Sequence, residues 1–197
     1  LPISEQFPGA RIVAGYQALI DDAQVEAIYI ATPHVSHAEW AIKAAEAGKH
    51  VMVEKPITLT VSEGVRLVEA GKKANRKLAV AENYRRDPIN RLVKALLTDG
   101  AIGAPRLMIE TSIGGRDNIL ITPWRHMKHT GSITLDVGVH NADILRYYMG
   151  EFKTVFGVSQ QHEKTRRNTG STGPGGFYGR WSANYPDTIE PTGEDAL

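Results

Sequence analysis

Lys55 stands where an ammonium group can meet a ligand. It follows the apolar residues 51–53, which have the composition of a short strand, and it lies between Glu54 and Pro56. In α/β folds, ligands bind in the crevice beyond the carboxyl ends of the strands. Proline fixes its own backbone angle, so the chain around Lys55 is restrained. Lys55 is therefore a candidate binding or catalytic group, and the alternative is an ordinary surface lysine that follows a strand.

Asp136 and His140 form a second candidate pair. They are four residues apart, so on a helix they share one face, and Asp143 extends the same row. Histidine is the side chain whose ordinary pKa lies nearest neutrality, which makes His140 the candidate for proton transfer. Asp136 would orient the imidazole or a substrate hydroxyl. The alternative is an exposed polar stripe that stabilises the helix by about 0.2–0.5 kcal/mol.

A metal site is a further alternative, because His126, His129 and His140 could cluster. Zinc sites combine histidine with cysteine or carboxylate ligands. The chain has no cysteine, and no glutamate stands at helical spacing from these histidines. We therefore expect no metal.

Three strings occur in a fixed order along the chain. They are Val25-Glu-Ala-Ile-Tyr-Ile-Ala-Thr-Pro, then Ala47-Gly-Lys-His-Val with Glu54-Lys55-Pro56, and finally Asp136-Val-Gly-Val-His140. In these motifs the chain resembles the Gfo/Idh/MocA oxidoreductases. The resemblance runs from near the first residue to about Gly150 and returns at residues 191–197. It departs at Thr130-Gly131-Ser132, where the family usually carries three glycines.

This resemblance implies a set of site residues around a nicotinamide cofactor, NAD or NADP. Lys55 would bind the reacting oxygen beside the nicotinamide, with Asp136 and His140 as the other catalytic groups. The residues implied in cofactor binding are Thr32, Pro33, His37, Glu54, Lys55, Asn83, Trp124 and Arg125. Glu54 would meet a ribose hydroxyl and Asn83 the carboxamide. For His37 the alternative is an exposed residue in the first turn of a helix, and Trp124 could equally be a core residue beside a surface charge.

Strand and helix signals alternate through the first half of the chain. Apolar residues 25–31, 51–53 and 78–81 are predicted strands, the first of them buried on both faces. Between them, Ser36 with Glu39 and Thr60 with Glu63 are predicted capping boxes of two helices. The apolar faces expected for these helices are Ala38, Ala41, Ile42 and Ala45 in the first, and Val61, Val65 and Val68 in the second. This alternation predicts a parallel sheet with right-handed crossovers.

The second half predicts a different architecture. Asp87-Pro88 has the form of a helix start, followed by an apolar stripe from Ile89 to Leu97. Residues 105–113 are the expected first strand of a second domain. The predicted fold class is α/β, a partial Rossmann-type parallel sheet followed by part of an α+β second domain. Residues 1–83 are the expected partial dinucleotide-binding domain. Residues 84–197 are the expected part of the substrate or oligomerisation domain. The segment 162–187, rich in Gly, Asn, Thr and Arg and containing Phe177, Tyr178, Trp181 and Tyr185, is expected to be an ordered excursion or lid.

Composition excludes several classes of protein. The 197 residues carry a formal net charge of +1 with both signs interspersed, which gives no electrostatic reason for nucleic-acid or membrane binding. No apolar run approaches the roughly 20 residues that span a bilayer, and the cytoplasm is the expected compartment. A Gly-x-Gly-x-x-Gly turn is absent, and the chain begins without Met. We therefore expect an internal fragment of a longer protein. The intact protein is expected to be a homo-oligomer.

The function that these expectations favour is hydride transfer between nicotinamide and a secondary alcohol of a small-molecule sugar, inositol or related polyol. Two alternatives stay open. One is an NAD-dependent glycosidase that uses transient oxidation at the same site. The other is a ligand-sensing protein that keeps the fold without turnover, and the presence of Lys55, Asp136 and His140 argues against it.

Overall fold

The computed structural model describes residues 3–112, 117–170, 182 and 184–196. The chain divides into two compact units, Leu1–Ala81 and Glu82–Leu197. Each unit is described by itself. The domain boundary expected from the sequence, after Asn83, stays a prediction.

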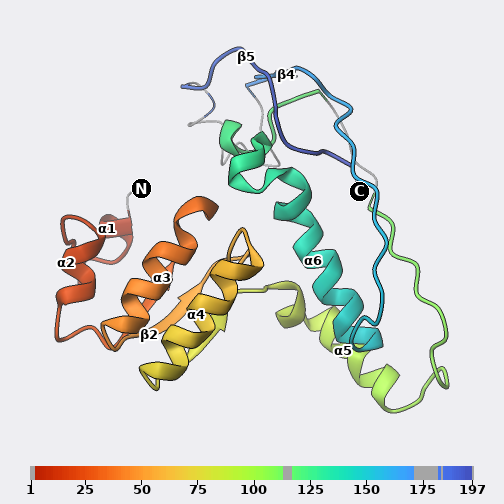
Figure 1. Ribbon diagram of the computed structural model, residues 1–197, viewed down its shortest axis with the longest axis horizontal. Helices are drawn as coiled ribbons and strands as arrows, with labels where there is room; N and C mark the ends of the chain where they lie inside the picture. The colour runs from red at the N-terminus through yellow and green to blue at the C-terminus, as the bar shows by residue number, and fades with distance from the viewer. Residues whose placement is uncertain (1–2, 113–116, 171–181, 183, 197) are drawn as a thin grey trace. The chain divides into compact units, whose positions relative to one another are not determined.

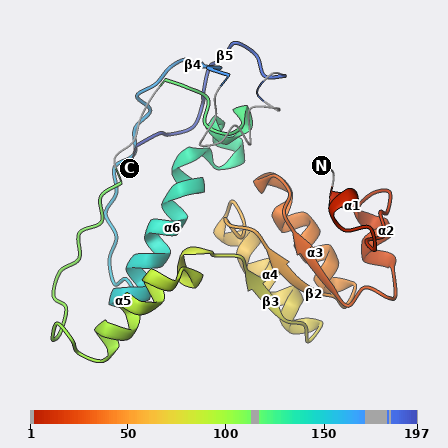
Figure 2. The same cartoon turned by 180° about the vertical axis from the view of Figure 1, so that it is seen from behind.

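The first unit is built on a parallel sheet. Strands β1 (Ala27–Ile30), β2 (His50–Val53) and β3 (Leu78–Val80) are hydrogen-bonded in the order β1-β2-β3, with Ile30 opposite Val53 and Val53 opposite Val80. Helices α3 (His37–Glu46) and α4 (Val61–Lys73) connect these strands and lie side by side on one side of the sheet (Figures 1 and 2). Two short helices, α1 (Ile3–Gln6) and α2 (Tyr16–Asp21), precede them. The predicted parallel α/β arrangement is confirmed.

The core of this unit lies between the sheet and these helices. Its buried residues are Ile20, Ile28, Ile30, Ala41, Ala44, Ala45, Val51, Val53, Leu67 and Ala70. Complete burial of a side chain such as Leu67 stabilises a fold by about 1.5–3 kcal/mol. The expectation that the first strand is buried on both faces is wrong, because burial alternates along β1 and Tyr29 is 55% exposed. In the described part of the chain the helices cover one face of this strand.

Only one of the two predicted capping boxes forms. At α4, Thr60 Oγ1 accepts from the Glu63 amide at 3.2 Å and the Thr60 amide donates to Glu63 Oε2 at 3.0 Å, as predicted. The Ser36 box is wrong: a 3₁₀ turn, η1 (His34–Ser36), precedes α3, and the Ser36 hydroxyl bonds Thr32 Oγ1 and the Pro33 carbonyl. That turn brings Ser36 back onto the preceding residues, so its hydroxyl is occupied there.

The apolar face expected for α4 is also wrong. Val61, Val65 and Val68 are 86%, 50% and 40% exposed, whereas Leu67 and Ala70 are buried. Leu67 lies three residues before Ala70, so the two share a helix face, and this face packs on the core.

The second unit is dominated by two helices. The 3₁₀ turn η2 (Tyr84–Arg86) leads into α5 (Pro88–Thr98), where Asp87 accepts from the Ile89 amide at 3.1 Å as the predicted cap. Two more 3₁₀ turns, η3 (Pro123–His126) and η4 (Lys128–Thr130), precede the long helix α6 (Ser132–Met149). The short strands β4 (Arg166–Arg167) and β5 (Thr188–Ile189) pair antiparallel.

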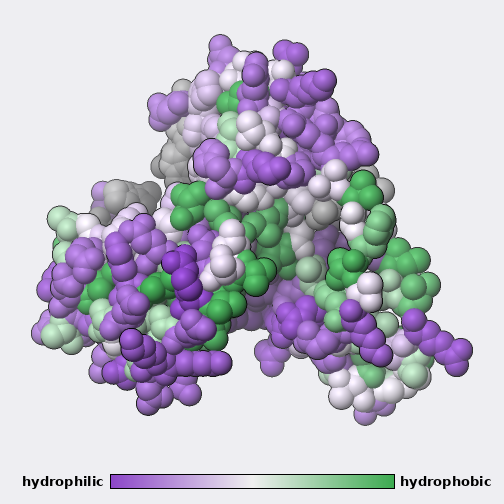
Figure 3. Space-filling view, viewed as in Figure 1, coloured by the Kyte–Doolittle hydropathy of each residue, from purple (hydrophilic) through white to green (hydrophobic). Residues whose placement is uncertain are grey.

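The predicted strand at residues 105–113 is wrong over its described part, residues 105–112, which is extended without strand pairing. Leu107 and Ile109 are 77% and 78% exposed. A strand is stabilised by hydrogen-bonded neighbours, and no described segment pairs with this one. The stripe on α5 is likewise amphipathic but unburied, with Leu92 53% exposed. Figure 3 shows the resulting apolar surface, in green, on this unit.

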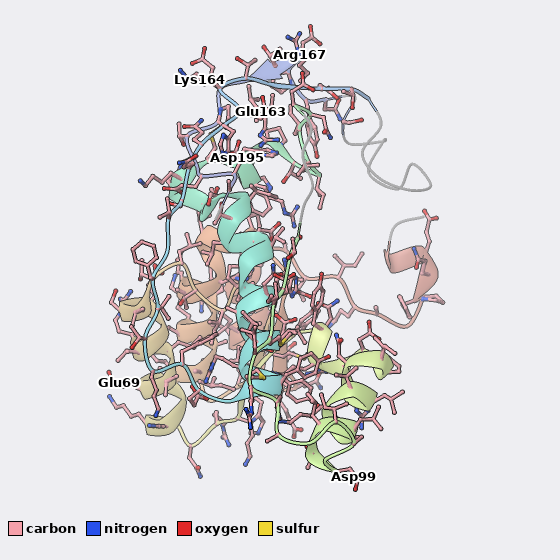
Figure 4. All side chains as sticks on the ribbon, turned by 90° about the vertical axis from the view of Figure 1, so that its right-hand side faces the viewer. Glu69, Asp99, Glu163, Lys164, Arg167 and Asp195 are labelled. Atoms are coloured by element: carbon pink, nitrogen blue, oxygen red, sulfur yellow. The ribbon has the colours of Figure 1, made fainter. Side chains whose placement is uncertain are left out.

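Asp195 holds the end of the described chain in place. Its carboxylate accepts from the His162 and Glu163 amides at 2.7 and 2.9 Å and pairs with Arg166 at 3.0 Å (Figure 4). Burial by itself raises the pKa of Asp195, but these hydrogen bonds and the Arg166 charge outweigh it, so the pKa lies below its usual value. Part of the excursion predicted over residues 162–187, namely 171–181 with Phe177, Tyr178 and Trp181, and residue 183, lies outside the described residues. None of the helices in the described chain combines the length and apolar character needed to cross a bilayer.

Candidate active site

The carboxyl ends of the three parallel strands lie at one edge of the sheet. The Glu54 amide donates to the Ile30 carbonyl at 2.9 Å, and the Ala81 amide donates to the Val53 carbonyl at 2.8 Å. The three strands therefore end at the same level of the sheet. Thr32 and Pro33 follow β1 at this edge. Ligands of open α/β sheets bind beyond such an edge.

Lys55 lies at the same edge, two residues after the end of β2, as the sequence predicts. It is half-buried, and the Lys55–Pro56 peptide bond is cis. The neighbouring Glu54 carboxylate accepts a hydrogen bond from the Tyr29 hydroxyl on β1 and another, at 3.2 Å, from the Lys55 amide. Glu54 is therefore held in one orientation beside Lys55.

His37 is completely buried, with 0% of its surface exposed. Its Nδ1 lies 2.7 Å from the Pro56 carbonyl oxygen, and its Nε2 lies 2.8 Å from the Thr32 carbonyl oxygen. The alternative of an exposed first-turn residue is therefore wrong. The ring instead lies between the loop after β1 and the loop that carries Lys55, and one of its nitrogens faces a carbonyl oxygen of each loop.

His140, in the second unit, belongs to a buried acid–base pair. Its Nδ1 lies 2.7 Å from Glu82 Oε1, and the two side chains are only 9% and 10% exposed. The same oxygen accepts the Tyr84 amide at 3.0 Å. The Tyr84 ring stacks on the imidazole with centroids 4.1 Å apart and planes 9° apart. The imidazole is thus fixed both in its plane and at one nitrogen.

Glu82 and Tyr84 were missed by the sequence reasoning. A signal for Glu82 exists, because it is a carboxylate immediately after the predicted strand 78–81, where ligand-binding side chains gather. Asn83, between them, was singled out instead, and its side chain is exposed.

Asp136 is buried and pairs with a different group from the one expected. Arg125 Nε donates to Asp136 Oδ2 at 2.9 Å, and the Arg125 guanidinium lies 4.6 Å from the centre of the Trp124 ring. The carboxylate found at His140 Nδ1 is Glu82. The expectation that Asp136 orients the imidazole is therefore wrong at Nδ1, where Glu82 is the partner.

The shared face of α6 is confirmed as a row of polar groups, each with its own partner. Asp136 accepts a hydrogen bond from Arg125 of η3, and His140 pairs with Glu82. Asp143 accepts two hydrogen bonds from Arg85 of η2, at 2.5 and 2.9 Å. The hydrogen bond to Asp143 raises the pKa of Arg85 above its usual value. The α6 row is thus tied into its own unit along its length.

The histidines considered for a metal site have other surroundings. His126 is 2% exposed, and its Nε2 accepts the Leu120 amide at 2.9 Å. Burial, followed by the Arg166 charge, lowers the pKa of His126 to about 4, so this ring is neutral near pH 7. Among the residues that the structure describes, no three His, Cys, Asp or Glu side chains gather as metal ligands would.

A parallel sheet whose strands are joined by helices defines an open α/β fold, which binds ligands at its carboxyl edge. A family model described as "Oxidoreductase family, NAD-binding Rossmann fold" matches residues 3–82, and one described as "GFO/IDH/MocA C-terminal domain" matches residues 90–184. The chain belongs to the Gfo/Idh/MocA oxidoreductase family. The expected family and the nicotinamide dinucleotide cofactor are therefore confirmed at the level of the family.

Similar proteins include sugar and polyol dehydrogenases. Levoglucosan dehydrogenase of Pseudarthrobacter phenanthrenivorans is 40% identical over 79% of this chain and 41% of its own length. Myo-inositol 2-dehydrogenase of Thermotoga maritima is 35% identical over 68% of this chain and 39% of its own length. A solved structure of levoglucosan dehydrogenase with NADH and levoglucosan has a TM-score of 0.72 at 34% identity, covering 83% of this chain and 45% of that one. The chain thus spans less than half the length of these relatives.

Proposed function

We propose that this chain is part of an NAD(P)-dependent oxidoreductase that moves a hydride between nicotinamide and a secondary alcohol of a sugar, inositol or related polyol. The observation that carries the proposal is the buried His140–Glu82 pair, in a chain whose sheet belongs to an NAD-binding family. The relatives named after levoglucosan and myo-inositol support the substrate class.

In this proposal the cofactor is held at the carboxyl edge of the sheet. The fixed Glu54 carboxylate suits this, because it is an acceptor and ribose offers hydroxyl donors. Thr32, Pro33 and Asn83 would line the nucleotide, with Trp124 and Arg125 near cofactor and substrate. The chemistry that nicotinamide supplies when bound is to accept or return the hydride.

The proton is handled by this chain's own side chains. Lys55 binds the reacting oxygen, since an ammonium group carries three donors and a positive charge that stabilises a developing alkoxide. His140 takes the hydroxyl proton during oxidation and returns it during reduction. Asp136, held by Arg125, contributes a buried negative charge on the same helix.

The test uses the protein encoded by the complete reading frame that contains this chain. Lys55→Ala and His140→Ala should each lower turnover on a sugar or inositol substrate by about 10²- to 10⁴-fold, because a positioned acid or base is removed. Lys43→Ala is the matched control, since this lysine is paired with Glu39 on α3. Nicotinamide binding, measured by calorimetry, should persist in all three variants. Turnover within a few-fold of wild type for both active-site variants would reject these roles.

A further inference from the structure

The Glu82 carboxylate is oriented by a backbone contact that does not involve His140. One of its oxygens, Oε1, accepts the Tyr84 amide at 3.0 Å and lies 2.7 Å from His140 Nδ1. The backbone donor is two residues away in a tight turn, so the position of Oε1 is set locally. A carboxylate that is itself fixed in this way can orient its partner.

This contact assigns the proton on the imidazole. An ionised carboxylate is only an acceptor, so a neutral His140 bonded to Glu82 must carry its proton on Nδ1. The lone pair then lies on Nε2. A neutral ring with the opposite tautomer would set two acceptors against each other at 2.7 Å.

We infer that Glu82 is the positioning residue that selects the Nδ1–H tautomer of His140 and so leaves Nε2 as the atom that receives the substrate proton. This inference rests on the proposed function for its catalytic consequence. Glu82 touches neither of the reacting atoms in this assignment and acts through His140. Tyr84 completes the arrangement, because its stacked ring fixes the plane in which Nε2 lies.

The proton balance of the step is simple. The substrate O–H bond breaks and its proton bonds to His140 Nε2, while the hydride leaves the same carbinol group to the oxidised nicotinamide dinucleotide. The imidazolium that results carries a positive charge 2.7 Å from the Glu82 carboxylate. Opposite charges at this distance stabilise the product of proton transfer. Glu82 therefore favours both the starting tautomer and the charged ring that follows.

The first experiment reads the tautomer without any substrate. Histidine ring nitrogens are labelled with ¹⁵N, and the signals of His140 among the seven histidines are assigned by their loss in His140→Gln. Wild type should show a protonated Nδ1 and an unprotonated Nε2 above pH 8. Glu82→Leu should move the proton to Nε2, whereas Asp143→Asn should leave the pattern unchanged, because Asp143 bonds Arg85. A wild-type ring protonated on Nε2 overturns the inference.

The second experiment reads the consequence for turnover. Glu82→Leu and the isosteric Glu82→Gln, which removes the charge with little change of shape, should each lower kcat by at least about tenfold with KM nearly constant. Asp143→Asn should stay within about twofold of wild type. Unchanged kcat in both Glu82 variants overturns the positioning role. If the tautomer responds to Glu82 but His140→Ala keeps full turnover, the proposed function of His140 fails while the tautomer assignment stands.

Discussion

His37 offers the sharpest test of how the carboxyl edge is held together. His37→Leu keeps a side chain of similar size but removes the ring nitrogens that lie 2.7 Å from the Pro56 carbonyl oxygen and 2.8 Å from the Thr32 carbonyl oxygen. Pro56 is among the most completely buried residues, so water cannot readily replace the imidazole at its carbonyl group. A neutral imidazole carries one N–H and can donate to only one of these two carbonyl groups. An unsatisfied buried polar group costs about 1–3 kcal/mol, so a loss of about 1–3 kcal/mol is expected in the free energy of unfolding.

The assay is equilibrium urea unfolding followed by circular dichroism, with hydrogen exchange as a local readout. His129→Leu is the control, because His129 is an exposed histidine and surface changes stay within about 0.5 kcal/mol. In His37→Leu the amides of Glu54 and Ala81, which bond across the strand ends, should exchange faster than in wild type. A loss below about 1 kcal/mol, with unchanged exchange at these two amides, would show that His37 does not hold the two loops.

Three further changes test other parts of the structure. The pKa of His126 in the folded state is about 4, so as the pH falls the unfolded chain binds a proton at this residue before the folded chain does. The free energy of unfolding should therefore decrease between pH 6.5 and 4 by up to about 3 kcal/mol. His126→Gln should reduce this dependence on pH, measured by urea unfolding at several pH values. Thr60→Ala should cost about 1 kcal/mol in thermal unfolding by removing the cap of α4, whereas Glu69→Ala on the same helix (Figure 4) should be nearly neutral. Gly193→Ala would place a methyl group 2.4 Å from Ser132 Cβ and should destabilise the fold by about 1–3 kcal/mol. An unchanged free energy of unfolding in this variant would contradict the close packing of Gly193 on Ser132.

The parts of the fold that could be predicted depend on contacts near in sequence. The Thr60 capping box spans three residues, and the Asp87 cap spans two, so each is written in a short string. The parallel order of the strands follows because each pair is joined by a helix. Ser36 shows the limit of such signals: it has the correct spacing for a cap, but the preceding turn takes its hydroxyl.

The site was predictable where a residue's position depends on one element. Lys55 lies at a strand end, and Asp136 and His140 share a helix face, so periodicity was sufficient to place them on these elements. Their catalytic roles were expected from the resemblance to the family. The partner of His140 is 58 residues away in the sequence, and although Glu82 follows a predicted strand, no local pattern pairs it with His140. His37 was placed on the correct helix, but its burial depends on the Pro56 loop, which lies 19 residues further on.

The place of Glu82 in the chain matters for anyone who recombines members of this family. Glu82 is the first residue of the second unit, although it follows the last strand of the first unit almost at once. A chimera joined at the end of the matched NAD-binding segment, residue 82, would inherit Glu82 from one parent and His140 from the other. A junction after Ala81 keeps the carboxylate, the stacked Tyr84 and the histidine from a single parent. The unit that carries the Glu82–His140 pair therefore begins one residue before the boundary that family matching would suggest.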